Sequence, residues 1–253
     1  MSLLSIRGVT KKFGGLRALH NCSFSTESSS IVSLIGPNGA GKTTVFNLIS
    51  GITPVTSGSI SFKGRELVDL KSFEIAELGI GRTFQNTHLF NEASVLDNVR
   101  IGSHCRTEAG LLDCLFRTAR YKREERYVKE KAEEFLELIG LFPRRNYLAG
   151  ALSYGDQKRV EIARALMIEP SLLLLDEPNS GMNDYETSGL VELFSRIKES
   201  GITLFIISHH MKFVQEISDQ VIVLNYGKVI ANGTPESIVS DERVIESYLG
   251  AVH

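Results

Sequence analysis

Short continuous apolar runs alternate along the chain with longer segments that have helical spacing. Residues 31–35, 172–175 and 202–207 are almost wholly apolar, which is typical of parallel strands buried on both faces of a sheet. Residues 4–9, 18–24, 58–63, 82–85, 221–224 and 229–231 are also predicted strands. Predicted helices are 45–50, 72–78, 96–101, 111–119, 121–139, 157–167, 185–199, 235–239 and 243–249.

The alternation of strands and helices predicts an α/β protein with a mainly parallel sheet that helices cover on both faces. Between about residues 86 and 150 the sequence has no convincing strand pattern. The charged segment 121–139 reads as an exposed helix, supported by pairs such as Glu125 and Lys129. We therefore expect a helical insert within the α/β unit.

The stretch GPNGAGKTT lies between the predicted strand 31–35 and the predicted helix 45–50. It matches the phosphate-binding loop G-x-x-x-x-G-K-T in the strand-then-helix context that this motif requires. Its glycines allow successive backbone N–H groups to face a phosphate, and the helix adds the positive end of its dipole. The predicted nucleotide-binding residues are Gly36, Pro37, Asn38, Gly39, Ala40, Gly41, Lys42, Thr43 and Thr44. Lys42 is expected on the β- and γ-phosphates and Thr43 on Mg²⁺.

A second motif follows the apolar run 172–175, which ends in Asp176, Glu177 and Pro178. We expect Asp176 to hold Mg²⁺ through water, as the acidic residue of this motif does in P-loop hydrolases. Glu177 then faces the same crevice, where it can orient or deprotonate a water for attack on the γ-phosphate. The phosphate loop alone is compatible with kinases and GTPases, and this second motif narrows the choice.

Composition adds two exclusions. The 253 residues are 42% hydrophobic and 23% charged, with a formal net charge of -2. This balance argues against a broad basic face for nucleic acid, so no nucleic-acid partner is expected. No apolar run approaches the ~18 residues of a membrane span, and the first residues lack the layout of a secretion signal. Any action at a membrane is expected from the cytosol, through partners.

GPNGAGKTT, LSYGD at 152–156 and LLLLDEP at 172–178 together resemble the ATP-binding subunit of an ABC transporter. The resemblance covers essentially the whole chain. It implies a P-loop NTPase (RecA-like) fold with an N-terminal antiparallel β part and an inserted helical subdomain. Within the single domain 1–253, residues 1–85 and 166–253 are the expected core, and 86–165 the helical subdomain with the signature motif.

The resemblance also implies roles for single residues, with ATP and Mg²⁺ as cofactors. Phe13 matches the adenine-stacking aromatic, and Gln85 the glutamine that contacts Mg²⁺ and the attacking water. Ser153 and Gly155 match the signature residues that donate to the ATP of the opposite subunit. Glu177 matches the catalytic carboxylate, and His209 the histidine that contacts the γ-phosphate. The implied partners are a second ATPase subunit, permease subunits at the cytoplasmic face of the membrane and, indirectly, a substrate-binding protein.

Further segments resemble one branch of this family, the ATPases of branched-chain amino acid importers with their urea and amide relatives. These segments are KFGGL at 12–16, RTFQN at 82–86, GMN at 181–183 and the ending from GTP at 233–235 to YLG at 248–250. The alternatives are another importer of this kind, a lipopolysaccharide exporter or a soluble ABC-type ATPase without membrane partners. A P-loop kinase does not account for the signature.

Three departures from the family pattern bear on the rate of hydrolysis. Asp156 replaces the usual glutamine at the end of the signature, which places a carboxylate near a phosphate. The sequence Ser208-His209-His210 replaces the commoner Glu-His-Asp, so the histidine loses an acidic neighbour. A serine at 29 or 30 stands where a glycine is usual.

Overall fold

A six-stranded sheet forms the centre of the computed structural model, which describes residues 2–83, 89–106 and 111–249. Its strand order is β10-β9-β3-β8-β7-β6; neighbours from β9 to β6 are parallel, and β10 is antiparallel to β9. The strands are β3 (Ile31–Ile35), β6 (Ile80–Arg82), β7 (Leu172–Asp176), β8 (Thr203–Ile207), β9 (Gln220–Asn225) and β10 (Lys228–Gly233). The predicted parallel sheet is therefore confirmed.

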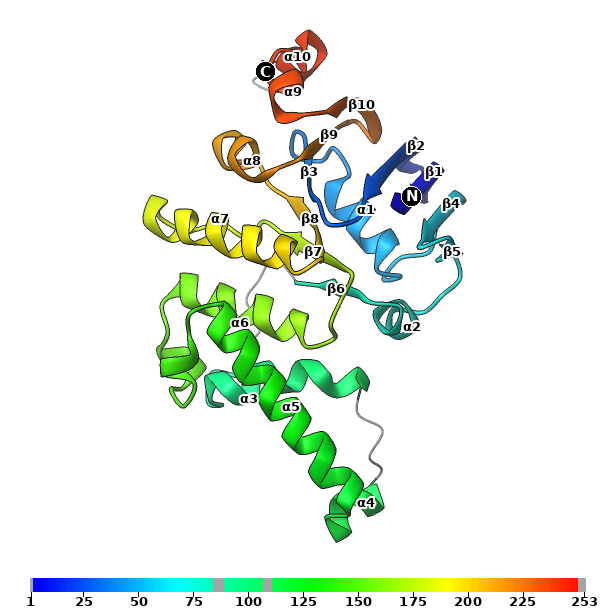
Figure 1. Cartoon of the computed structure of the whole chain (residues 1–253). Coiled ribbons are helices and arrows are strands. Elements are labelled where there is room, and N and C mark those ends of the chain that lie inside the picture. Colours follow the sequence, from blue (N-terminus) through cyan, green and yellow to red (C-terminus); the bar gives the residue numbers. More distant parts are fainter. Residues whose placement is uncertain (1, 84–88, 107–110, 250–253) are drawn as a thin grey trace.

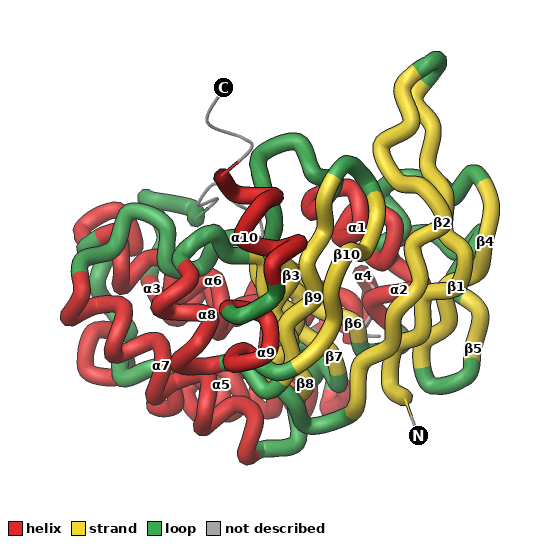
Figure 2. Tube along the Cα trace, turned by 90° about the horizontal axis from the view of Figure 1, so that it is seen from above, coloured by secondary structure: helices red, strands yellow, loops and turns green. Residues whose placement is uncertain are grey.

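A second sheet of four strands, all antiparallel, comes from the N-terminal part in the order β2-β1-β4-β5. Its strands are β1 (Ser2–Phe13), β2 (Leu16–Glu27), β4 (Ser57–Phe62) and β5 (Arg65–Glu66). The hairpin of β1 and β2 projects beyond the rest of the molecule (Figure 2). The expected N-terminal antiparallel part is thus present.

The helices lie on both faces of the six-stranded sheet and in a group below it (Figure 1). They are α1 (Lys42–Ile49), α2 (Ser72–Glu77), α3 (Val95–Arg100), α4 (Leu111–Phe116), α5 (Ala119–Leu138), α6 (Tyr154–Leu166), α7 (Asp184–Glu199), α8 (Met211–Ile217), α9 (Pro235–Val239) and α10 (Glu242–Leu249). Short 3₁₀ turns are η1 (Ile101–Arg106), η2 (Phe142–Arg144) and η3 (Ala149–Ala151). In the described portions of the chain, no helix is long and apolar enough to cross a membrane.

The described residues of the predicted insert, 89–106 and 111–165, form helices and turns but no strand. Helix α5 begins where the Thr118 hydroxyl accepts a hydrogen bond from the Tyr121 N–H, a typical N-terminal cap. Its buried residues Val128, Ala132 and Phe135 form the narrow apolar stripe of an otherwise charged helix. The predicted boundaries between the nucleotide-binding core and the helical subdomain, after residue 85 and before residue 166, stay a prediction.

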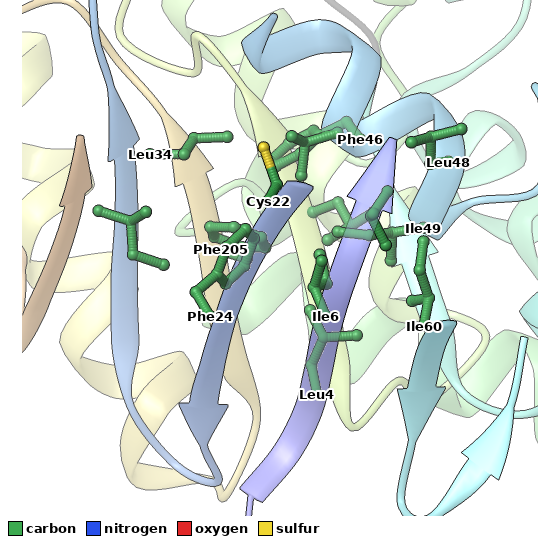
Figure 3. Packing of buried hydrophobic residues seen from close by; sticks show 14 of the residues in the cluster. Leu4, Ile6, Cys22, Phe24, Leu34, Phe46, Leu48, Ile49, Ile60 and Phe205 are labelled. Carbon is green, nitrogen blue, oxygen red and sulfur yellow. The ribbon is translucent and has the colours of Figure 1, made fainter. Parts of the chain in front are cut away.

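The core between the two sheets is built around helix α1 (Figure 3). Phe46 of α1 and Phe205 of β8 are both fully buried, with ring centroids 5.3 Å apart. Phe24 of β2 meets Phe205 edge-on at 5.9 Å. A second cluster fills the space between the other face of the central sheet and helices α5, α6 and α7. These two layers hold β3, β7 and β8 in place, and the candidate site lies at their ends.

The predicted first residue of the strand at 82–85 is wrong, because the strand begins two residues earlier, at Ile80. Strand β6 covers Ile80–Arg82, which pair with Leu172, Leu173 and Leu174 of β7. A Cβ at Gly81 would lie 3.1 Å from both the Leu173 side chain and the carbonyl oxygen of Ala165. Glycine therefore lets α6 approach the sheet here, and its absence of a side chain hid the strand in the sequence pattern. The end of the predicted strand lies outside the described residues.

Candidate nucleotide-binding site

The phosphate loop joins the end of β3 to the start of α1, and two of its glycines are required by the backbone. Gly36 has a φ of 145°, and a Cβ there would collide with the carbonyl oxygen of Leu224. Gly41 has a φ of 104°, and its Cβ would lie 2.8 Å from the carbonyl oxygen of Ala18. Only glycine tolerates both the left-handed φ and this close approach. The loop is thus wedged between β2 and β9.

Lys42 is the first residue of α1, and its side chain lies back over the loop. Its Nζ donates hydrogen bonds to the carbonyl oxygens of Gly36 at 2.7 Å and Pro37 at 3.0 Å. Burial lowers the pKa of the Lys42 ammonium, and the carboxylates of Glu177 and Asp176 oppose this shift. A cation held among these groups is well placed to meet a phosphate.

Asp176 ends strand β7 and is 4% exposed. Its Oδ2 lies 3.8 Å from Nη2 of Arg82, while Nη1 of the same guanidinium donates to the Ser50 hydroxyl at 2.7 Å. Burial raises the pKa of Asp176; the guanidinium of Arg82 and the ammonium of Lys42 oppose the rise, and the Glu177 charge adds to it. Sequence reasoning missed the link to Arg82, because residues distant in the chain meet only through the pairing of β6 with β7.

Glu177 follows directly and has a left-handed φ of 49°. Its N–H donates to the carbonyl oxygen of Ile207 at 2.9 Å, so the strained backbone is held by the end of β8. Residues in this region of φ cost free energy and are concentrated at functional sites. The side chain is partly buried, and its Oε1 lies 3.3 Å from Nδ1 of His209. Two residues predicted from separate strand ends are therefore in direct contact.

His209 follows β8 and remains partly open to solvent. Its ring centroid lies 4.2 Å from that of His210, and the two ring planes are tilted by 37°. Ser208, which precedes it, is fully buried; its hydroxyl contacts the Asn179 side chain at 3.3 Å and accepts from the His210 N–H at 3.2 Å. In the sequence Ser208-His209-His210, His209 therefore has an aromatic neighbour where an acidic residue is usual. The carboxylate beside His209 comes from Glu177.

A cavity of about 530 Å³ gathers most of the predicted residues. Phe13, at the tip of the β1–β2 hairpin, is 48% exposed, and Nζ of Lys11 lies 4.8 Å from its ring centroid. The cavity is lined by Phe13, Leu16, Arg17, Ala18, Asn38 to Thr44, Asp176, Glu177, Ile207, Tyr226 and Gly227. Leu16, Arg17, Ala18 and Tyr226 were not predicted as nucleotide contacts from the sequence. Gln85 lies outside the described residues.

The signature residues are not among those lining this cavity. Ser153 is the N-terminal cap of α6, and its hydroxyl accepts a hydrogen bond from the Asp156 N–H at 3.2 Å. Gly155 is buried, and a Cβ there would lie 2.6 Å from Oε1 of Glu186. Within one chain these residues therefore stand apart from the phosphate loop, at a separate helix N-terminus with the partial positive charge that suits an anion.

Comparison with known proteins bears on this geometry. The family described as "ABC transporter" matches residues 19–180, more than half of the chain. The chain belongs to the ABC transporter family. In this ABC cassette, residues 228–253 also match the family described as "Branched-chain amino acid ATP-binding cassette transporter". It lies in the branch of the proteins named LivG and BraF.

Among the relatives of the cassette is the high-affinity branched-chain amino acid transport ATP-binding protein LivG of Salmonella typhimurium, 43% identical over 98% of both chains. BraF of Pseudomonas aeruginosa, with the same description, is 42% identical over 98% of both. Among solved structures, the ADP conformation of the ATP-binding cassette MJ1267 has a TM-score of 0.87 and 34% identity over 99% of both chains. The fold of this ABC cassette is thus that of an ABC ATPase.

Proposed function

We propose that the chain is the ATP-hydrolysing subunit of an importer for branched-chain amino acids. The observation that carries the catalytic part is Glu177, whose strained backbone and contact with His209 hold a carboxylate at the nucleotide cavity. The family assignment supports an ATPase, and the C-terminal match at 228–253 supports the substrate class.

The chemistry follows from the residues around the cavity. Backbone N–H groups of the phosphate loop and the Lys42 ammonium take the β- and γ-phosphates, where Lys42 exchanges loop carbonyls for phosphate oxygens. Glu177 orients a water in line with the γ-phosphate and accepts its proton as the water attacks. His209 fixes the direction of the Glu177 carboxylate and reaches the same phosphate. Phe13 stacks on the adenine.

Thr43 and Asp176 fit a Mg²⁺ ion, with Gln85 as the third predicted ligand. Both described residues line one cavity and offer oxygen atoms, the donors that Mg²⁺ prefers. The buried Asp176, whose pKa burial raises, gains most from a nearby cation. In the described part of the chain, no cluster of three or more His, Cys, Asp or Glu side chains forms a metal site. Oxygen atoms of the bound phosphates would supply further ligands to the ion. When bound, the ion neutralises charge on the β- and γ-phosphates.

The exposed Ser153 and the N-terminus of α6 supply a second half-site, which is complete only when another cassette provides the phosphate loop. We infer a dimer with two ATP molecules between the subunits; a solved cassette related to this chain is a dimer in a post-hydrolysis state bound to ADP and Pi. That cassette, MJ0796, is 25% identical over 92% of this chain, with a TM-score of 0.76. Closing and reopening of the dimer drives permease subunits at the cytoplasmic face of the membrane, to which a substrate-binding protein delivers the amino acid.

The test of the catalytic assignment is Glu177→Gln. The variant is expected to bind ATP normally, to lose most of its turnover and to form a nucleotide-dependent dimer. Phosphate release and gel filtration with ATP measure these properties. Glu192→Gln on α7 removes an exposed carboxylate outside the cavity and is the matched control. Turnover of Glu177→Gln near the level of the unaltered chain would contradict the assignment.

The substrate is tested by uptake. Cells that carry this chain with its own permease and binding protein are expected to accumulate labelled leucine, isoleucine or valine, and Glu177→Gln to abolish this uptake. Accumulation of urea or an amide instead would assign the chain to the related urea or amide importers.

A further inference from the structure

The turn between β9 and β10 carries an exposed tyrosine beside the nucleotide cavity. Asn225 and Lys228 pair across this hairpin, so the loop consists of Tyr226 and Gly227 alone. Their φ values are 42° and 72°, the pattern of a type I′ turn. This turn favours Asn-Gly, because a left-handed φ is unfavourable for a bulky side chain. Tyrosine at its first position thus opposes the local backbone preference.

The turn is fastened to two walls of the cavity. The Gly227 N–H donates to the carbonyl oxygen of Ala40 at 3.0 Å, and the Gly227 carbonyl accepts from the His20 N–H at 2.8 Å. A Cβ at Gly227 would lie 2.5 Å from the carbonyl oxygen of Ala18. Ala18 and Ala40 both line the cavity. The backbone beside Tyr226 is therefore fixed where β2 and the phosphate loop meet.

The side chain of Tyr226 is 88% exposed and shares the cavity with the exposed Phe13 and Leu16. Apolar surface left in water is stabilised when a ligand covers it. An aromatic ring can stack on a base, and a phenol can hydrogen-bond a ribose hydroxyl. In Figure 2 the β1–β2 hairpin and the β9–β10 hairpin reach toward the same side of the molecule. The two aromatic rings therefore come from separate hairpins to one cavity.

We propose that Tyr226 is a specificity-determining contact to the base or ribose of the bound nucleotide, additional to Phe13. This inference rests on the proposed function, since it assigns a further residue to the same ATP site. Strained residues that the surrounding structure holds in place are concentrated at ligand sites. An asparagine at this position would suit the turn but has no aromatic ring. The unfavourable backbone conformation of Tyr226 is therefore explained if its ring contacts a ligand.

The test is Tyr226→Asn in the full chain, with equilibrium dialysis of ATP and, separately, of inorganic tripolyphosphate. The variant is expected to unfold at the same or a higher temperature, because it suits the type I′ turn. Its Kd for ATP is expected to rise at least about fivefold, the low end of base–aromatic stacking. Its Kd for tripolyphosphate is expected to be unchanged. Tyr226→Phe separates the two contacts: retained ATP affinity assigns the ring to the base, and a loss equal to that of Tyr226→Asn assigns the hydroxyl to the ribose.

Tyr185→Asn is the matched control, since Tyr185 is also 88% exposed but lies on α7, outside this cavity. An unchanged ATP affinity of Tyr226→Asn overturns the proposal. Equal weakening of ATP and tripolyphosphate overturns it as well, because the turn then acts only through the phosphate loop. If the unaltered chain binds no ATP, the proposed function itself fails. This result is distinct from a failure of the Tyr226 proposal, in which the unaltered chain and the variant bind ATP equally well.

Discussion

Arg144 and Asp156 form an ion pair at the start of helix α6, with 2.5 Å between Nη1 and Oδ2. Asp156 is the residue that departs from the signature pattern, and its N–H is held by the Ser153 hydroxyl. A carboxylate suits this helix N-terminus, yet its charge repels the phosphate that Ser153 is proposed to bind. Arg144, at the end of the 3₁₀ turn η2, supplies the opposite charge within the same chain.

We therefore predict that Arg144→Ala lowers the rate of ATP hydrolysis and that a second change, Asp156→Gln, restores it. The free energy of unfolding should fall by less than about 1 kcal/mol, because exposed ion pairs contribute little to stability. Steady-state phosphate release and urea denaturation measure the two effects.

The matched control is Arg243→Ala, which breaks another exposed pair, Arg243 with Asp241 at 2.6 Å, far from the signature in the chain. It should leave hydrolysis unchanged. A double variant as slow as Arg144→Ala alone would show that Arg144 acts independently of Asp156.

Gly36→Ala is predicted to weaken ATP binding and to destabilise the fold, since the added Cβ meets the backbone of β9 at Leu224. Gly39→Ala is the comparison, because Gly39 also has a left-handed φ, 80°, but its Cβ would meet nothing within 4 Å. The cost of Gly39→Ala is then limited to about 1–2 kcal/mol of backbone conformation. Chemical denaturation ranks the two variants. Equal losses would mean that φ alone, and not the approach of Leu224, requires glycine at 36.

Burial raises the pKa of Asp176, which gives the protein a defined pH dependence. Just above the ordinary carboxyl pKa, the unfolded chain has released this proton while the folded chain still holds it. The free energy of unfolding therefore declines as pH rises through this range. Compared with Asp176→Asn, which has no such proton, the unaltered chain should lose stability between acidic and neutral pH. Urea denaturation without nucleotide at several pH values measures the difference.

Asp69→Asn serves as the control for this pH series, because Asp69 is exposed and asparagine tolerates its left-handed φ. Its stability curve should run parallel to that of the unaltered chain. Parallel curves for Asp176→Asn as well would contradict a raised pKa at that carboxyl.

The composite site predicts complementation between two inactive variants. In a mixed dimer of Lys42→Ala and Ser153→Ala, one site has lost both groups, and the other pairs an intact phosphate loop with an intact signature. Mixing the purified variants should therefore restore phosphate release that neither shows alone. Lys42→Ala mixed with a second Lys42 variant, such as Lys42→Met, is the control and should remain inactive. Absence of recovery in the first mixture would contradict a site shared between two copies.

The sequence predicted those parts of the site that local chemistry determines. The loop from Gly36 to Thr44 needs glycines at fixed spacing, and the apolar runs of β7 and β8 place Glu177 and His209 at strand ends. Parallel pairing brings such ends to one edge of the sheet, so both residues were expected at that edge, and the structure adds their direct contact.

The contacts that sequence reasoning missed depend on register and on tertiary approach. Arg82 reaches Asp176 only because β6 pairs with β7 at one register, and Gly81 conceals that strand by having no side chain. Arg144 meets Asp156 across a turn, and Tyr226 lies at a position where turn chemistry favours another residue. Single-sequence patterns contain no information on such pairings.

The hydrogen bonds around Gly227 join β2, the phosphate loop and the β9–β10 turn into one piece. Phe13 and Lys42, at the two ends of the candidate site, are attached to parts of that piece. These segments of the candidate site are therefore joined to one another through backbone hydrogen bonds. In the proposed dimer we expect the joined segments of each subunit to move together, so that the motion passed to a partner is that of one subunit against the other.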